Sequence, residues 1–248
     1  MPDLTPIQWL LAAIAAAGIG ISKSGFAGFG LLHVIVFAFL FGARDSTGVL
    51  LPMLIAGDIA AVAAFRRHAQ WVYIRRMLPP TMVGVVAAAA VMSRLDEAMF
   101  RPVIGWIILV LTVLQVGRML RPDWFADVPH TRRFAWGMGL AAGAATMLAN
   151  AAGSILALYC VAVSLPKWEL VGTTAWLFLL INVFKLPFSV GLGLVHADTL
   201  LLGAVLLPAI GAGLFAGRWL TARIPQRAFD AFLLVFAAVA ALRLIGVI

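Results

Sequence analysis

The stretch Gly18-Ile-Gly-Ile-Ser-Lys-Ser-Gly-Phe-Ala-Gly-Phe-Gly30 places a lysine, Lys23, in a glycine-rich break between two apolar runs. An ionisable side chain far inside a membrane costs at least about 2.5–3.5 kcal/mol, so it usually has a partner or a ligand. The stretch therefore predicts a functional cation within a membrane protein. The alternative is that Lys23 extends to the cytoplasmic interface at the end of a first spanning helix, and that the glycines serve only close helix packing.

The composition supports the membrane setting. Hydrophobic residues make up 64% of the chain and charged residues 11%, and the mean hydropathy is +1.07, whereas a soluble domain has about 25% charged residues. We therefore expect an all-α, polytopic membrane protein with a single transmembrane domain over residues 1–248. Ten apolar segments are present, five in each half, at residues 10–20, 26–41, 47–65, 77–92, 103–116, 134–148, 155–165, 170–194, 199–217 and 229–247.

Arginine-rich loops alternate with loops that are poor or balanced in charge. The outward loops are expected at residues 42–46, 93–101 and 195–198, and both termini are expected on that side, because the positive-inside rule places basic loops in the cytoplasm. The net charge of +8 then reports orientation, and no nucleic-acid partner is expected. The basic loops carry Arg66, Arg67, Arg75, Arg76, Arg118, Arg121, Arg132, Arg133, Arg218, Arg223 and Arg227.

The two halves of the chain match each other in several places. Residues 47–48 align with 171–172 at an offset of 124, which places Asp58 opposite Asn182. Pro80-Thr-Met-Val-Gly84 resembles residues 208–213, and residues 93–100 align with 222–229. The main basic loop follows the third segment in the first half but the fourth segment in the second. We therefore expect two inverted repeats, at about residues 5–120 and 134–248, as in many secondary transporters.

The first two segments of each repeat are expected to form a broken or re-entrant hairpin, with glycine-rich tips at residues 18–30 and 146–154. Two short tilted crossings are the alternative, and they leave the topology unchanged. Irregular backbone at membrane depth must be buried or line a cavity. If the tips meet, two helix N-termini face one volume and form an anion site, to which Lys23 adds a full charge. Hydroxyl and amide groups would donate hydrogen bonds, and glycines would allow close approach. The candidate substrate-binding residues of the tips are Lys23, Ser22, Ser24, Gly25, Gly28, Asn150, Gly153 and Ser154.

Further polar residues lie within apolar runs. Burial of Asp58 would favour its neutral form, so we expect this residue to couple transport to protons. Lys185 follows Asn182 by one helical step, and both could face the same cavity. Thr173, Asn182 and Lys185 are further candidates for substrate binding, although Thr173 and Asn182 are equally suited to hydrogen bonds between helices. A structural ion pair between Asp58 and Lys185 is the alternative, and His33 is interpreted as a packing residue.

Four stretches give the chain its resemblance to a known family. They are Thr146-Met-Leu-Ala-Asn-Ala-Ala-Gly-Ser-Ile-Leu-Ala-Leu-Tyr159, Leu165-Pro-Lys167, Val171-Gly-Thr-Thr-Ala-Trp176 and Asn182-Val-Phe-Lys-Leu-Pro187. Over nearly its whole length the chain resembles the sulfite exporter TauE/SafE family of bacterial membrane proteins. It departs from the family pattern in having Gly172-Thr-Thr174 where Gly-Thr-Ser is usual. The resemblance implies a transporter in the cell inner membrane that exports sulfur-containing anions such as sulfite and organosulfonates.

Secondary transport of a small oxyanion is the function expected from these features, with an anion channel as the alternative because both use the same groups. A membrane-embedded enzyme is disfavoured, since the four histidines have no metal-ligand spacing. We expect no cofactor and no metal. The expected partners are the small anionic substrate and the lipid bilayer, and small-residue faces such as Gly211-Ala-Gly213 could join helices within one subunit or make a homodimer.

Overall fold

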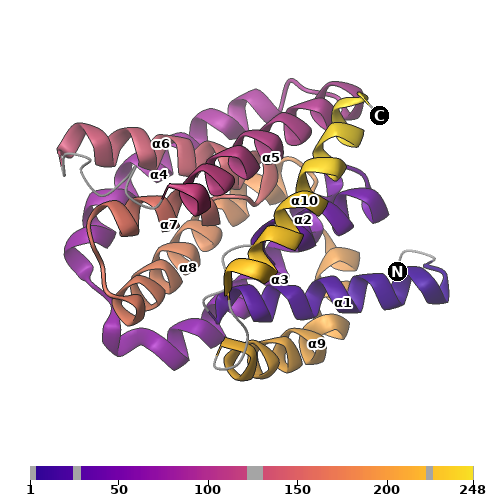
Figure 1. The fold of residues 1–248 in the computed structure, drawn as a ribbon. Helices are drawn as coiled ribbons and strands as arrows, with labels where there is room; N and C mark the ends of the chain where they lie inside the picture. The colour runs from indigo at the N-terminus through magenta and orange to yellow at the C-terminus, as the bar shows by residue number, and fades with distance from the viewer. Residues whose placement is uncertain (1–3, 25–28, 122–130, 222–225, 248) are drawn as a thin grey trace.

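The computed structural model describes residues 4–24, 29–121, 131–221 and 226–247, and in these residues it consists of α-helices and one 3-10 turn (Figure 1). The all-α prediction is confirmed, and ten α-helices correspond to the ten predicted segments. They are α1 (Pro6–Lys23), α2 (Phe29–Phe41), α3 (Asp45–Phe65), α4 (Trp71–Met92), α5 (Glu97–Leu120), α6 (Arg132–Ala149), α7 (Gly153–Ala162), α8 (Lys167–Gly191), α9 (Ala197–Thr221) and α10 (Gln226–Ile245), with the 3-10 turn η1 (Arg66–His68) after α3.

Local side-chain chemistry sets several helix ends. α1 begins with a capping box in which Thr5 and Gln8 satisfy each other's backbone groups, followed by Pro6 at the first helical position. Asp96 accepts from the backbone N of Met99 at 2.8 Å and caps α5. At the C-terminus of α6, Asn150 adopts the left-handed conformation, with φ of 52°, and ends the helix. That turn sends the chain directly into α7.

Within the part of the chain that the structure describes, six helices are long and apolar enough to cross a membrane: α1, α3 together with η1, α4, α5, α8 and α9. Large apolar side chains cover their outer faces; Leu10 is 59% exposed, Val113 62% and Phe215 75%. A surface of this kind is matched to lipid rather than to water. The helices α2 and α7 have 13 and 10 residues, so at about 1.5 Å per residue each is shorter than a hydrocarbon core of about 30 Å.

Backbone-to-backbone contacts join α1 to α9 and α4 to α6, pairs that run side by side in Figure 1. A Cβ atom on Gly213 would overlap the backbone of Ala17, and one on Gly143 would overlap the carbonyl of Thr81. Glycine is therefore required at these two positions by close approach. The helices α3 and α8 pack against each other between these pairs and carry Asp58 and Asn182.

In the small-residue stretch Gly211-Ala-Gly213, one of the two glycines packs against another helix of the same chain. Gly213 contacts α1, whereas a Cβ atom on Gly211 would meet nothing within 4 Å. We predict that Gly213→Ala destabilises the protein by about 1–3 kcal/mol, because the added methyl group is forced into the backbone of Ala17.

The matched control is Gly211→Ala on the same helix, which we expect to be neutral or slightly stabilising because alanine favours the helix. Thermal unfolding of both variants in detergent measures the difference. Equal melting temperatures would show that α1 and α9 are not in backbone contact.

Candidate functional site

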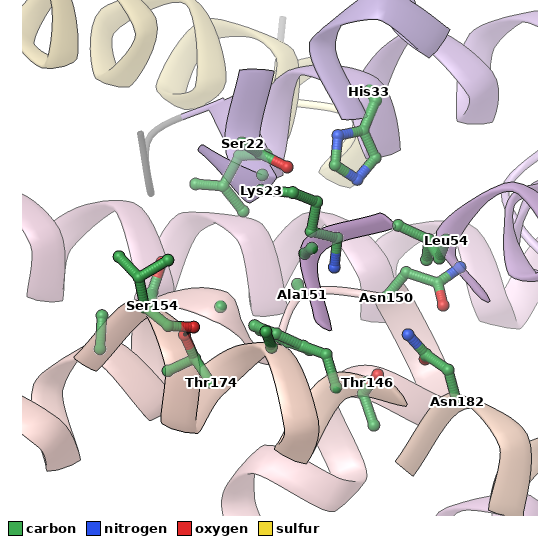
Figure 2. A pocket seen from close by; sticks show the side chains of 18 of the residues that line it. Ser22, Lys23, His33, Leu54, Thr146, Asn150, Ala151, Ser154, Thr174 and Asn182 are labelled. Atoms are coloured by element: carbon green, nitrogen blue, oxygen red, sulfur yellow. Dashed lines mark hydrogen bonds between the residues drawn. The ribbon is translucent and has the colours of Figure 1, made fainter. Parts of the chain in front are cut away.

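A cavity of about 100 Å³ lies where α1, α2, α3, α6, α7 and α8 meet. Ser22 and Lys23 at the end of α1 form one wall, and Thr174, Phe178 and Asn182 on α8 form another. Figure 2 shows Lys23, Asn150 and Asn182 grouped around the same part of the cavity. The cavity therefore brings together polar groups from both halves of the chain.

A buried ion pair lies against this cavity. Lys23 Nζ is 2.5 Å from Asp58 Oδ1, and the two side chains are 8% and 0% exposed. Asn182 Nδ2 donates to the other carboxylate oxygen at 2.7 Å. The ammonium also lies 4.2 Å from the ring centre of Phe178, a cation–π distance. Both charges thus have partners in the apolar interior, as buried charges require.

A second ammonium group lies behind the cavity wall. Lys185 Nζ donates to the Thr146 carbonyl at 2.9 Å and to Asn150 Oδ1. The Asn150 amide nitrogen in turn donates to the Thr47 carbonyl at 2.9 Å. Asn150 therefore ties the end of α6 to both α8 and α3, and Lys185 places positive charge at the negative end of the α6 dipole.

Two helix N-termini open onto the cavity. Gly30 and Leu31 at the start of α2 line it, as do Gly153 and Ser154 at the start of α7. The first helical hydrogen bond of α7 runs from Leu156 N to the Ala152 carbonyl at 2.9 Å, so the preceding N–H groups have no intrahelical acceptor. Such N–H groups, together with an ammonium, suit a small oxyanion.

The structure brings together most of the side chains predicted for the site. Ser22, Lys23, Asn150, Gly153, Ser154 and Asn182 all line the cavity. Asp58 and Lys185 are not among the lining residues but contact them directly. Gly25 and Gly28 lie outside the described residues, as do the first four residues of the 222–229 stretch.

Ser24 and Thr173 form hydrogen bonds that link different segments of the bundle. The Ser24 hydroxyl donates to the Leu214 carbonyl of α9 at 3.1 Å. Thr173 Oγ1 accepts from the backbone N of Gln70, beyond η1, at 2.9 Å. Neither residue is among those lining the cavity. Both instead form hydrogen bonds between separate segments of the bundle, which is the alternative role given above for Thr173.

The alternative pairing of Asp58 with Lys185 is wrong. Asp58 forms its ion pair with Lys23, and Lys185 is bound to Thr146 and Asn150. The reason is that Lys185 lies within reach of the C-terminal carbonyls of α6, while Lys23, as the last residue of α1, points into the bundle toward α3. Lys23 is thereby engaged in the protein interior and does not extend from the end of α1.

Several lining residues were not predicted: Thr146, Thr174 and Phe178, together with His33, which was interpreted as packing. Helical spacing could have found two of them. Thr174 and Phe178 precede Asn182 by eight and four residues, so all three lie on one face of α8. Thr146 takes part through its carbonyl as well as its hydroxyl, and the sequence offers no signal for a backbone contact.

Over the described residues, an all-helical bundle with several helices long and apolar enough to span a membrane defines a polytopic membrane protein, and a buried cation lines its central cavity. The family model described as Sulfite exporter TauE/SafE matches residues 10–244. The chain therefore belongs to this family of membrane transporters, and the predicted resemblance is confirmed. No curated protein and no solved structure matched the chain.

Asn150 offers a test of the site's architecture. We predict that Asn150→Gly and Asn150→Ala both destabilise the protein, by about 1–3 kcal/mol, because each leaves the buried Lys185 ammonium and Thr47 carbonyl short of a partner. Asn150→Ala should be worse by a further 1 kcal/mol or so, because alanine is disfavoured at φ of 52°.

Thermal unfolding of the two variants separates the roles of side chain and backbone. If the alanine variant is as stable as the glycine variant, the left-handed turn after α6 is absent. If both match the native chain, Asn150 does not hold Lys185.

Proposed function

We propose that this protein is a secondary transporter that exports small sulfur-containing oxyanions, sulfite and organosulfonates, by alternating access. The observation that carries the proposal is the cavity in which the Lys23 ammonium faces the starts of α2 and α7. A sulfur oxyanion offers several acceptor oxygens and a full negative charge. The cavity offers the Lys23 ammonium, which is paired with Asp58 in this structure, and backbone N–H groups, which form strong hydrogen bonds with anions.

The proposed substrate contacts follow from this geometry. Lys23 supplies the charge, and the backbone of Gly153 and Ser154 donates hydrogen bonds. Ser22 also lines the cavity, with its hydroxyl donating to the Ile19 carbonyl at 2.7 Å. Asn150 and Asn182 complete the polar lining, with Lys185 holding Asn150 in place. Gly25 and Gly28 remain proposed contacts at the first hairpin tip, Ser24 and Thr173 support the site, and Asp58 is the proposed proton-coupling residue.

We also propose that the chain consists of two inverted repeats, residues 5–120 and 134–248. Helix packing supports this: α1 packs on α9 as α6 packs on α4, α3 packs on α9 as α8 packs on α4, and α2 packs on α10 as α7 packs on α5. Exchanging the first five helices for the last five turns each of these six contacts into its counterpart. In addition, Asp58 and Asn182, separated by the repeat offset of 124 residues, are hydrogen-bonded to each other, as equivalent residues beside a two-fold axis would be. Such transporters place their sites between the repeats near the membrane midplane.

The proposed orientation has both termini in the periplasm and the arginine-rich loops in the cytoplasm, with the protein in the inner membrane. Both termini lie at one end of the bundle in Figure 1, which supports a shared side. The single cysteine, Cys160, is fully buried, so an introduced cysteine can report its own accessibility.

We predict that an impermeant thiol reagent added to intact spheroplasts labels His196→Cys but not His68→Cys. Both histidines are exposed, and they lie in an outward loop and a basic loop respectively. Labelling of both variants after membrane disruption is the control. The reverse pattern in intact spheroplasts would invert the proposed orientation.

The anion site is tested by thermal shift of the purified protein with sulfite, sulfate and methanesulfonate. A ligand at a hundredfold excess over its dissociation constant stabilises the folded state by about 2.7 kcal/mol. Lys23→Met alone would leave the buried Asp58 carboxylate unpaired, which costs about 3–5 kcal/mol. The informative variant is therefore Lys23→Met/Asp58→Asn, which removes both charges.

We predict that at least one sulfur oxyanion raises the melting temperature of the native chain and of Asp58→Asn, whereas the double variant does not respond. Arg94→Met, which removes an exposed cation, is the control and should respond like the native chain. A double variant that responds as the native chain does would move the anion site away from Lys23.

A further inference from the structure

We propose that Asp58 competes with the substrate anion for Lys23, so that binding of an anion is accompanied by uptake of one proton by Asp58. The inference rests on the proposed anion site and adds how that site is filled and emptied. In the empty protein the Asp58 carboxylate is the counter-ion of Lys23. A substrate anion must take the place of this carboxylate in order to bind.

The position of Lys23 between the carboxylate and the cavity is the first argument. Lys23 lines the cavity, whereas Asp58 is 0% exposed and lies behind it, with its Oδ1 2.5 Å from the ammonium. An anion entering the cavity therefore meets an ammonium that is already neutralised. Two full negative charges around one buried ammonium repel each other, so the arrangement favours loss of one of them.

Of the side chains that the structure describes, only Lys23 forms an ion pair with Asp58. Among the described residues, the nearby titratable side chains are Lys23 on α1, Lys185 on α8 and His33 on α2, which lines the same cavity. Lys185 is bound to the end of α6 through Thr146 and Asn150. Once Lys23 turns to an anion, a fully buried Asp58 carboxylate would lose its compensation, and such groups are neutralised by a proton.

Asn182 can hold Asp58 in either form. Its Nδ2 donates to the carboxylate at 2.7 Å, while its Oδ1 is buried and has no hydrogen-bond partner among the described residues. An amide carries both donors and an acceptor, so rotation of the side chain by half a turn would present Oδ1 to a protonated Asp58. A buried acceptor without a partner is costly. When Asp58 is protonated, Asn182 Oδ1 gains a hydrogen-bond donor.

The proposed step is balanced without any covalent change in the substrate. Before it, Lys23 and Asp58 form an ion pair; after it, Lys23 pairs with the anion, and Asp58 carries one proton taken from water and donates it to Asn182 Oδ1. With one proton bound per anion, the affinity for the anion rises as the pH falls, and the dependence approaches tenfold per pH unit where Asp58 is ionised in the empty protein.

Calorimetric titration of methanesulfonate into the purified protein tests the inference. The sulfonate group stays ionised between pH 6 and 8, so any proton taken up belongs to the protein, whereas sulfite would take up protons itself. Titration in two buffers of different ionisation enthalpy gives the number of protons bound per anion. The variants are Asp58→Asn, in which the competitor is neutral, and Lys23→Met/Asp58→Asn, in which the cation is also absent.

We expect about one proton per methanesulfonate for the native chain, with an affinity that rises on going from pH 8 to pH 6. Asp58→Asn should bind with no proton uptake, independently of pH, and at least tenfold more tightly than the native chain at pH 8. Should Asp58→Asn fail to fold, the proton count of the native chain decides the question.

Two results would overturn the inference, and they are distinguishable. Equal affinities of the native chain and Asp58→Asn, without proton uptake in either, would refute the competition but leave the anion site intact. Failure of methanesulfonate to bind the native chain and Asp58→Asn, together with no thermal shift by sulfite or sulfate, or unchanged binding by the double variant, would refute the anion site and the competition together.

Discussion

The ion pair between Lys23 and Asp58 is the interaction on which the centre of this structure depends. Placing two charges in a low-dielectric interior costs several kcal/mol per ion, and this cost is offset only by close pairing and further hydrogen bonds. Asn182 and the Phe178 ring provide the additional contacts. Since a well-packed apolar pair would give comparable stability, the ion pair is not needed for stability alone, which is consistent with the proposed role of Lys23 in anion binding.

The ion pair also determines which helices must meet. Lys23 ends α1, Asp58 lies midway along α3, and Asn182 lies on α8, so satisfying the three polar groups fixes the first half of the chain against the second. Asn150 and Lys185 likewise join α6 to α8 and α3. The polar contacts thus hold together a bundle whose apolar helix faces have little preference for one another over lipid.

The helical fold and much of the site could be predicted from the sequence because both depend on features that are local in the chain. Apolar runs separated by charged loops define the helices, and a charge inside an apolar run, such as Lys23 or Asp58, is unusual enough to be noticed. The partners of these charges could not be predicted in the same way. Whether Asp58 meets Lys23 or Lys185 depends on the packing of α1 and α6 against α3 and α8, which no local pattern encodes. Contacts made by carbonyl groups, such as that of Thr146, leave no trace in the residue types at all.

The glycine contacts between helices constrain the motions open to this protein. Where carbonyl and Cα atoms of two helices touch directly, as Gly213 does with Ala17 and Gly143 with Thr81, no layer of side chains remains that could repack as the helices slide. Each of these contacts joins a helix of the first half of the chain to a helix of the second. We therefore expect the mixed pairs α1 with α9 and α4 with α6 to move as units in the proposed transport cycle, with hinges where these pairs adjoin the central helices α3 and α8. On this expectation the two halves of the sequence would not separate as independent blocks.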